Sequence, residues 1–323
     1  MTRRTRVVGT LVLTVAAVAY LVWKVELDTT LDVLADTHLG WFALAGAIMV
    51  FTVPVLAFRW GRLLAAHAIH ERLPWLTRAY FVAYTAGQVL PTSLGGDAVR
   101  VVETTRRHPG RATVVTGTVL LERGLGGAAT VVLGAAGFLV SIGDYDVSAY
   151  LWVEGLFVFG TLLLGFLFFA RSARPLLRRV EPLLERIRLA GLLRSFYEGI
   201  HHYRSQPRLL WGLFGLTLAV LAVRVLAIWA CARAVGIDLD PRIYYVFGPL
   251  YLLIMIVPFT LNGIAVREAF FVSFLGSVGV DPEAAFAAGF LFFLVTLVLA
   301  VPGGVIMLRS GFRGGARPEV EHV

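Results

Sequence analysis

The stretch "LPTSLGGDAVR", Leu90–Arg100, places a proline, a hydroxyl pair, two glycines and two charges inside an otherwise apolar chain. A similar stretch, "VPFTLNGIAVR", occupies Val257–Arg267. At a fixed offset of 167 residues, six of the eleven positions are identical, namely Pro91/Pro258, Leu94/Leu261, Gly96/Gly263, Ala98/Ala265, Val99/Val266 and Arg100/Arg267. Chance in a chain rich in Leu, Ala and Val is the alternative explanation, but proline, glycine and arginine in register favour an internal repeat.

The composition of the chain is that of a membrane protein. Of its 323 residues, 58% are hydrophobic and only 15% are charged, and the mean hydropathy is +0.78. Soluble domains are about 45–50% apolar and about 25% charged, so we expect lipid around much of this surface. The net charge of +8 is compatible with nucleic acid, but the arginines cluster in a few short loops. This clustering is typical of cytoplasmic loops, and we expect no nucleic-acid partner.

Apolar segments of about 20 residues, the length that crosses a bilayer, recur along the chain. We predict an all-α polytopic membrane protein with six full transmembrane helices: Val7–Trp23, Trp41–Phe58, Thr113–Val140, Tyr150–Ala170, Leu209–Ala230 and Ala284–Leu308. The N-terminal stretch also resembles a signal peptide with a charged region of three arginines. Because its apolar run continues to Trp23, we favour an uncleaved first helix.

The charges of the loops predict how the chain is oriented. Arginines cluster at the N-terminus, between Arg59 and Arg78, in segment 171–208 with nine arginines, and from Arg309 onward. Loop 24–36 instead carries four acidic residues against one lysine. By the positive-inside rule both termini are cytoplasmic, and we expect the protein in the cytoplasmic membrane. Leucines at helical spacing make segment 171–208 an expected amphipathic connector on that side.

Two further apolar segments, 79–102 and 244–279, fit this charge pattern as re-entrant hairpins. Basic residues flank the first on both sides, and a single crossing there would place the nine arginines of segment 171–208 outside. Its first arm, Ala79–Leu90, spans about 18 Å at about 1.5 Å per residue, too short for a core of about 30 Å. We therefore predict an inverted repeat of residues 1–140 and 150–308, with the two hairpins oppositely oriented.

The repeated stretch combines the residue types of an anion-binding site. Pro91 and Pro258 interrupt a helix, and residues suited to a turn and helix cap follow: Ser93, Gly95, Gly96, Thr260, Asn262 and Gly263. The N–H groups and positive dipole of such a helix start bind phosphate or carboxylate. Arg100 and Arg267 add full charges. The alternative is a structural kink in which Asp97 neutralises Arg100 at i,i+3 spacing.

Other charges inside the predicted spans strengthen the site hypothesis. Glu122 and Arg123 lie about ten residues into their helix, where charges usually face a bundle interior or a water-filled cavity. We expect them to form one mixed-sign cluster with Asp97 and Arg100, joined by Arg267.

Several other features have a structural interpretation. Arg224 and Glu154 also lie within spans, but they can sit nearer an interface because arginine snorkels. The histidines lack carboxylate or cysteine neighbours typical of metal sites, and the single cysteine, Cys231, allows no disulfide. The chain has no Walker-type glycine loop. We expect no metal and no cofactor.

Three segments resemble a known family: "AGQVLPTSLGGDAVRVVETTRR" at 86–107, "TVLLERGLGG" at 118–127 and "NGIAVREAFFVSFLGSVGVDPEAAFA" at 262–287. With them the chain resembles the lysylphosphatidylglycerol synthase transmembrane family, also called the flippase-like domain family, over nearly its whole length. In its best-known members this domain is thought to move aminoacylated phosphatidylglycerol to the outer leaflet, and relatives are linked to polyprenyl-phosphate glycolipids. The resemblance places at the polar centre Asp97, Arg100, Glu122, Arg123, Arg267 and Glu268.

The chain also departs from this family. Few residues follow Arg309, so we expect a stand-alone member without the soluble aminoacyl-transferase domain, which does not make lysyl-lipid itself. Asn262 stands where many relatives have glycine, and the last helix lacks an arginine analogous to Arg123.

These observations predict a lipid translocase whose partners are membrane lipids, either an anionic or aminoacylated phospholipid or a polyprenyl-phosphate lipid. The predicted substrate-binding residues are Ser93, Gly95, Gly96, Asp97, Arg100, Glu122, Arg123, Asn262, Gly263, Arg267 and Glu268. One alternative is a membrane glycosyl- or phosphoryl-transferase acting on polyprenyl phosphates, with Asp97 or Glu122 as base. Another is a scaffold for an envelope-synthesis complex. A separate lipid-modifying enzyme and a second copy of the chain are the protein partners that these hypotheses allow.

Overall fold

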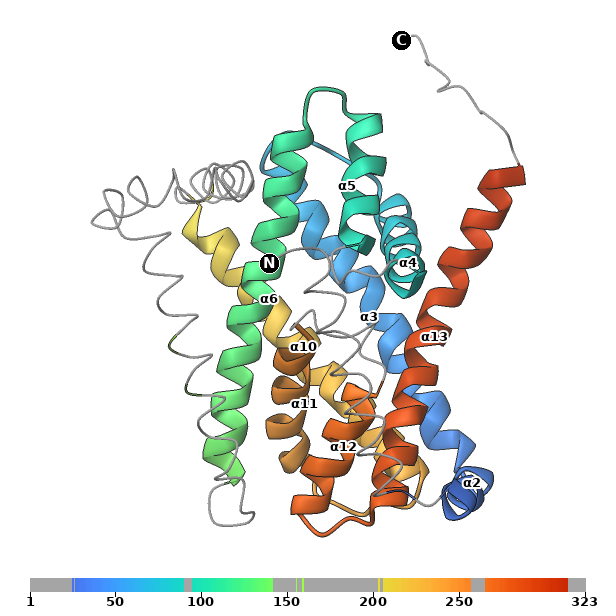
Figure 1. The fold of residues 1–323 in the computed structure, drawn as a ribbon. Coiled ribbons are helices and arrows are strands. Elements are labelled where there is room, and N and C mark those ends of the chain that lie inside the picture. Colours follow the sequence, from blue (N-terminus) through green and yellow to red (C-terminus); the bar gives the residue numbers. More distant parts are fainter. Residues whose placement is uncertain are drawn as a thin grey trace, which may run out of the picture.

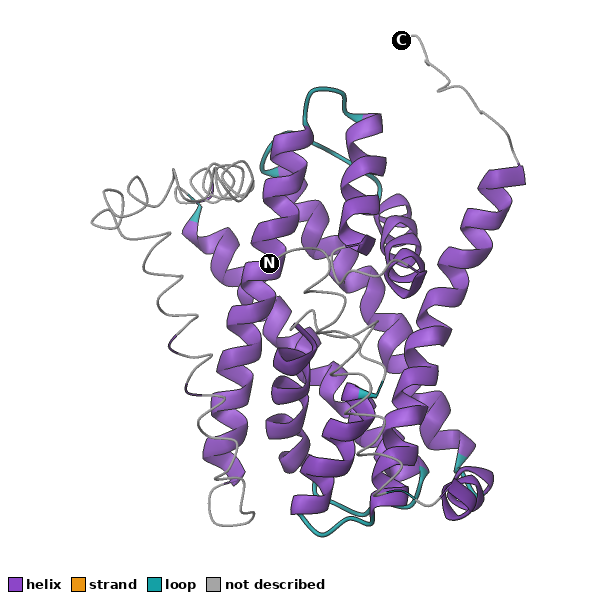
Figure 2. Ribbon diagram, viewed as in Figure 1, coloured by secondary structure: helices purple, strands orange, loops and turns teal. Residues whose placement is uncertain are grey.

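The computed structural model describes residues 25, 27–89, 95–141, 155, 159, 203, 206–256 and 265–312. Within these ranges the secondary structure is helical throughout, with turns and loops between the helices (Figure 2). Figure 1 labels the helices: α2 (Leu27–Ala35), α3 (Leu39–Ala65), α4 (Leu73–Val89), α5 (Gly95–Arg107), α6 (Ala112–Ser141), α10 (Pro207–Ala234), α11 (Pro241–Ile256), α12 (Val266–Ser277) and α13 (Pro282–Phe312). The predicted all-α class is confirmed for this part of the chain.

Four of these helices are long and apolar enough to cross a membrane: α3, α6, α10 and the Pro282–Arg309 part of α13. They contain 27, 30, 28 and 28 residues, and at about 1.5 Å per residue each exceeds a hydrocarbon core of about 30 Å. They coincide with four of the six predicted spans. The other two, Val7–Trp23 and Tyr150–Ala170, lie outside the described residues apart from Gly155 and Phe159.

Two pairs of shorter helices lie between the long ones. The α4–α5 pair occupies the upper half of the molecule in Figure 1 and the α11–α12 pair the lower half. These four helices contain 17, 13, 16 and 12 residues, so each is shorter than about 30 Å. The first pair begins at Leu73 and the second at Pro241, slightly before the predicted hairpins. The segments that join each pair, 90–94 and 257–264, lie outside the described residues.

Glycines allow the long helices to approach the short ones closely. A Cβ at Gly303 of α13 would collide with the carbonyl oxygen of Phe81 on α4. A Cβ at Gly137 of α6 would collide with the carbonyl oxygen of Tyr245 on α11. Small residues at helix contacts are typical of membrane proteins, because close backbone approach replaces the hydrophobic drive that lipid cannot supply.

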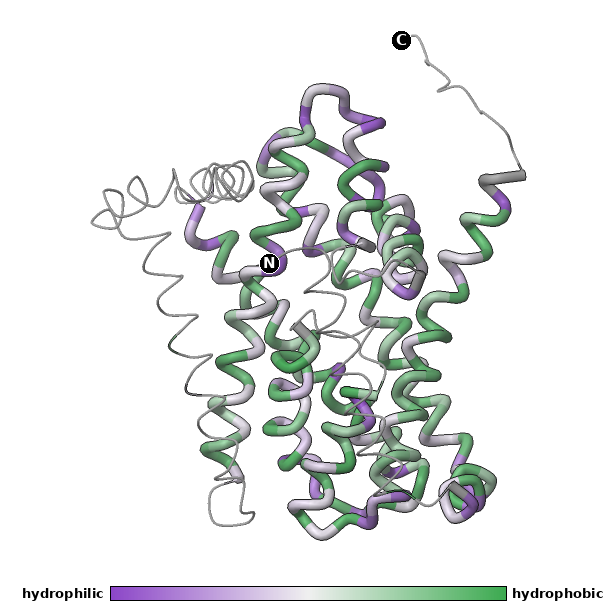
Figure 3. The backbone as a smooth tube through the Cα atoms, viewed as in Figure 1, coloured by the Kyte–Doolittle hydropathy of each residue, from purple (hydrophilic) through white to green (hydrophobic). Residues whose placement is uncertain are grey.

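The lower helix pair is held by aromatic rings. The ring centre of Phe247 on α11 lies 4.6 Å from that of Phe271 and 5.1 Å from that of Phe274, both on α12. Tyr251 on α11 packs edge-on against Phe292 on α13, with ring centres 5.7 Å apart. Figure 3 shows this half as largely hydrophobic, with hydrophilic residues in the loops at its lower end. Charged side chains are buried in both halves, at Arg100 of the upper pair and at Arg267 and Glu268 of the lower pair.

Candidate functional site

The first turn of α5 packs against α4 at a glycine. A Cβ at Gly96 would collide with the carbonyl oxygen of Ala83 on α4, so any larger residue would separate the two helices. Gly95 and Gly96 are both buried, and Asp97 follows them in the first turn of α5, where a carboxylate is favoured by the helix dipole. The glycine pair of the repeated stretch therefore positions Asp97 beside α4.

Glu122 of α6 lies at the centre of a set of buried ion pairs. Its carboxylate is 2.6 Å from Nη2 of Arg59 on α3 and 2.8 Å from Nη1 of Arg100 on α5. The same carboxylate accepts a hydrogen bond from the Tyr80 hydroxyl on α4. The side chains of Arg100 and Glu122 are each only 4% exposed. Because buried charges persist only when they are paired and hydrogen-bonded, this one carboxylate joins four helices.

Arg100 is further fixed by aromatic rings. Its guanidinium carbon lies 4.4 Å from the ring centre of Trp60 and 4.3 Å from that of Tyr80, distances at which a cation is attracted to a ring face. Nη2 of Arg100 donates a hydrogen bond to Oδ1 of Asp97 at 2.9 Å. The Trp60 ring is itself held by a hydrogen bond of 3.1 Å from Nε1 to Thr118. Contacts within the protein thus fix the position of the Arg100 guanidinium.

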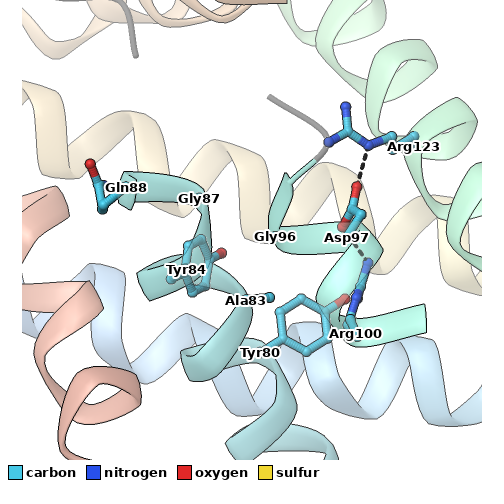
Figure 4. Close-up of a pocket in the computed structure, with 9 residues that line it drawn as sticks. All are labelled: Tyr80, Ala83, Tyr84, Gly87, Gln88, Gly96, Asp97, Arg100 and Arg123. Carbon is cyan, nitrogen blue, oxygen red and sulfur yellow. Dashed lines mark hydrogen bonds and ion pairs between the residues drawn. The ribbon is translucent and has the colours of Figure 1, made fainter. Parts of the chain in front are cut away.

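Asp97 extends the cluster toward the accessible edge of the molecule. Its second oxygen accepts a hydrogen bond from Nε of Arg123 on α6 (Figure 4). The side chain of Arg123 is 42% exposed, against 4% for Arg100. Three arginines, of which Arg100 is the most buried, therefore face two carboxylates, and the described residues of this cluster carry a net charge of +1.

A cavity of about 310 Å³ lies beside this cluster, between α4 and the start of α5 (Figure 4). Aromatic, small and charged residues line it, namely Tyr80, Ala83, Tyr84, Gly87, Gln88, Gly96, Asp97, Arg100 and Arg123. Its volume is at the lower end of the range of about 300–1,000 Å³ for ligand pockets, enough for a head group rather than a whole lipid. Guanidinium donors in such a cavity can bind phosphate or carboxylate oxygens.

The charged residues of the second stretch form a separate pair. Nε of Arg267 donates a hydrogen bond to Oε1 of Glu268 at 2.8 Å, and its guanidinium carbon lies 4.5 Å from the ring centre of Phe293 on α13. Their side chains are 5% and 8% exposed. Among the described residues, no ion pair joins either of them to the Arg100 cluster. Arg267 therefore pairs with Glu268 here, and its joining of the Arg100 cluster stays a prediction.

The two repeated stretches also differ in backbone conformation. Ala98 is helical within α5, whereas the equivalent Ala265 has a φ of 67° and precedes α12. Arg100 consequently lies in the second turn of its helix and Arg267 in the first turn of its own. Three other predicted site residues lie outside the described residues: Ser93, Asn262 and Gly263.

Three residues of the site are not predicted by the sequence patterns, namely Arg59, Tyr80 and Trp60. The charge pattern predicts a cytoplasmic loop for Arg59, because the predicted span ends at Phe58. Helix α3 instead continues, and Arg59 is only 6% exposed. The apolar residues that follow Arg59 at helical spacing continue the buried face of α3, and this pattern was the available indication that the arginine belongs to the helix.

These findings define the class of the protein. An all-helical chain with four membrane-length apolar helices and ion pairs buried between them is a multi-pass membrane protein.

The chain belongs to the family described as Lysylphosphatidylglycerol synthase TM region, which matches residues 7–304. The resemblance noted in its sequence motifs is confirmed. The chain is also similar to "Glycosyltransferase AglD" of Haloferax volcanii, with 30% identity over 347 aligned positions that cover 96% of this chain and 55% of that protein. The chain thus spans about half the length of the curated relative it matches.

Proposed function

We propose that this protein is a lipid translocase that binds an anionic lipid head group in the cavity between α4 and α5 and moves the lipid between leaflets. The observation that carries the proposal is the surplus positive charge of the buried cluster beside this cavity. Charges at membrane depth are costly and usually mark a ligand path. The fitting ligands are an anionic or aminoacylated phospholipid and a polyprenyl-phosphate-linked lipid, because guanidinium groups bind phosphate oxygens.

The distribution of charge at the two ends of the bundle supports a membrane orientation. The upper end carries Arg106 and Arg107 in the last turn of α5 and Arg72 and Arg111 in its loops, whereas α2 at the lower end carries Asp28 and Asp32. By the positive-inside rule the upper end faces the cytoplasm. With this orientation α4–α5 enters from the cytoplasmic face and α11–α12 from the opposite face, as the two re-entrant hairpins of an inverted repeat.

The exposed edge of the cluster offers an entry for the head group. The lipid phosphate would replace Asp97 as the partner of the Arg123 guanidinium. The released Asp97 carboxylate can then pair with a cationic group of the same head group or accept a hydrogen bond from one of its hydroxyl groups. Glu122 remains bound to Arg59 and Tyr80 during this exchange, so Arg100 keeps its position. The tails of the lipid remain in the bilayer.

The Arg267–Glu268 pair offers a second station in the opposite half of the molecule. Rocking of one helix pair against the other would expose a head group alternately to each leaflet, with Arg100 and Arg267 as the two phosphate ligands.

A vesicle assay tests this proposal. The purified full chain is reconstituted with fluorescent phosphatidylglycerol, lysylphosphatidylglycerol or polyprenyl phosphate, and accessibility of inner-leaflet label to an impermeant quencher is followed. We expect exchange with wild-type protein and a rate about tenfold lower for Arg123→Gln, which removes a charge-assisted bond to the head group. The matched control is Arg208→Gln at the exposed start of α10, which should keep the wild-type rate. No exchange of any of these lipids by folded wild-type protein would reject the proposal.

A transferase is the second candidate, and the similarity to a protein named a glycosyltransferase favours it. In this function Asp97 or Glu122 would act as base on a polyprenyl phosphate. Both carboxylates are already bound by guanidinium groups, so a substrate hydroxyl would have to displace an arginine to reach either of them. Incubation with a sugar donor and a lipid phosphate separates the two functions, because a transferase yields a covalently changed lipid that mass spectrometry detects.

A further inference from the structure

Arg224 lies in α10 at membrane depth. At about 1.5 Å per residue it is about 15 Å from the Ala234 end of the helix, roughly half of a hydrocarbon core of about 30 Å. Its guanidinium donates a hydrogen bond through Nε to Thr52 on α3 at 2.8 Å and another through Nη2 to the hydroxyl of Tyr84 on α4 at 3.0 Å. Arg224 is half-buried and bridges α3 and α4 from a position midway along the bundle.

Both hydrogen-bond partners of Arg224 are neutral hydroxyl groups. In the part of the chain that the structure describes, no carboxylate forms an ion pair with it. A guanidinium stays charged at any accessible pH, and charges inside a membrane are normally matched by an opposite charge. Arg224 thus differs from Arg59, Arg100 and Arg123, each of which has a carboxylate partner. Its missing counter-charge points to a ligand.

Tyr84 connects Arg224 to the cavity. Its side chain lines the cavity, and its hydroxyl oxygen lies on the side that faces Gly96 (Figure 4). That oxygen accepts the N–H of Arg224, so its own proton is the group left to donate to a cavity ligand. The neighbouring cation polarises this O–H and strengthens it as a donor to an anion.

We propose that Tyr84 and Arg224 form a second anion-binding arm of this cavity, and that the arm selects lipids whose head groups carry two negative charges. Such a head group is a phosphate monoester or a diphosphate, since a monoester carries about −1.5 to −2 at neutral pH. Among the residues that the structure describes, Arg224 raises the surplus positive charge around the cavity from one to two. A phosphodiester with one charge leaves one cation without a counter-charge. The inference rests on the proposed function, because it names the head group that the same site takes.

The test compares two lipids with identical tails. Dioctanoyl phosphatidic acid is a monoester and dioctanoyl phosphatidylglycerol a diester, and calorimetry measures the Kd of each for the full chain in detergent. We expect wild-type protein to bind phosphatidic acid about tenfold more tightly. Arg224→Gln should raise the Kd for phosphatidic acid to that for phosphatidylglycerol and leave the latter within about twofold. Tyr84→Phe removes the hydroxyl that donates to the ligand and accepts from Arg224, and should weaken phosphatidic acid binding about fivefold.

Matched variants keep the result interpretable. Arg208→Gln on the same helix removes an equal charge and should preserve the preference, and Arg224→Lys should retain part of it because the cation remains. If Arg224→Gln does not fold in thermal unfolding, Arg224→Lys and Tyr84→Phe decide the question. Glycerol phosphate, the head group without tails, should bind far more weakly, and equal affinity would overturn the assignment to a lipid.

Two outcomes distinguish this inference from the proposed function. Equal affinities of the wild type for both lipids, unchanged by Arg224→Gln and Tyr84→Phe, would overturn the charge selection and leave the translocase proposal intact. Failure of folded wild-type protein to bind either lipid or glycerol phosphate would remove both.

Discussion

The Glu122 carboxylate on α6 lies 2.8 Å from the Arg100 guanidinium on α5, and this contact ties a short helix pair to a membrane-length helix. Arg59 of α3 and Tyr80 of α4 reach the same carboxylate. The cluster is therefore the main polar contact of the upper half of the bundle and, in our proposal, also the head-group site. Substitutions in it affect stability and binding together, and each test needs a control that separates the two.

Replacing Glu122 by glutamine should destabilise the protein strongly. Arg59 and Arg100 would stay buried without their shared counter-charge, and removal of one partner of a buried pair costs about 3–5 kcal/mol. Thermal unfolding of the purified protein in detergent measures the loss. Glu103→Gln is the control, because Glu103 lies 3.6 Å from Arg78 in a partly exposed pair that contributes about 1 kcal/mol or less. Similar Tm values for the two variants would contradict the central role of Glu122.

Gly96→Ala should separate α5 from α4. The added Cβ meets the Ala83 carbonyl oxygen, and such overpacking typically costs about 1–3 kcal/mol. Lipid binding should weaken as well, since the cavity lies at this contact. On α6, a Cβ at Gly126 meets no atom within 4 Å, so Gly126→Ala should be neutral or stabilising through helix propensity. Unfolding and lipid titration of the two alanine variants check this, and an equally stable Gly96→Ala would show that the contact is not tight.

Asp240 caps the start of α11 outside the membrane-spanning helices. The backbone N–H of Arg242 donates to its carboxylate at 2.8 Å, and this bond, with those of the Arg242 side chain, lowers the pKa of Asp240 below its ordinary value of 3.8. A lowered pKa means that the stabilisation is present above the ordinary value and is lost as pH falls through the lowered one. Asp240→Ala should therefore lower Tm at neutral pH, and the difference from wild type should shrink below about pH 4. A difference independent of pH would show that the charge contributes nothing.

The depth of charged residues in the sequence predicted much of the upper cluster. The repeated stretch indicates Asp97 and Arg100, depth within an apolar helix indicates Glu122 and Arg123, and the structure brings these four together. The position of a charged residue along an apolar segment does not tell which helices pack against that residue. Arg224 is equally deep, but its partners on α3 and α4 depend on helix packing, which a single sequence does not reveal.

The internal repeat identifies Arg100 and Arg267 as equivalent positions, but the residues around the two arginines differ. Arg100 has Asp97 three residues before it, whereas the position three residues before Arg267 is Ile264, and Glu268 follows Arg267 directly. Arg100 pairs with the carboxylate at i−3 and with Glu122, whereas Arg267 pairs with the carboxylate at i+1. The repeat alone does not predict these different counter-charges.

The buried Arg267–Glu268 pair should contribute to the stability of the protein as a coupled unit. Arg267→Gln should leave Glu268 buried without its cation, and Oε2 of Glu268 has no hydrogen-bond partner among the described residues. We expect a loss of about 3–5 kcal/mol in this single variant. The double variant Arg267→Gln/Glu268→Gln replaces the pair by two neutral amides, and a double-mutant cycle from thermal unfolding should show that most of the loss is recovered. Additive losses would mean that the two side chains are not coupled.

The same double variant separates binding from transfer. The cavity between α4 and α5 contains neither residue, so the Kd for a short-chain anionic lipid should stay at the wild-type value. Exchange of that lipid between leaflets should nevertheless fall about tenfold or more, because the second station loses its cation. If the folded double variant exchanges lipid at the wild-type rate, then Arg267 and Glu268 hold α12 in place without taking part in transport, and the head group crosses with the upper cluster alone.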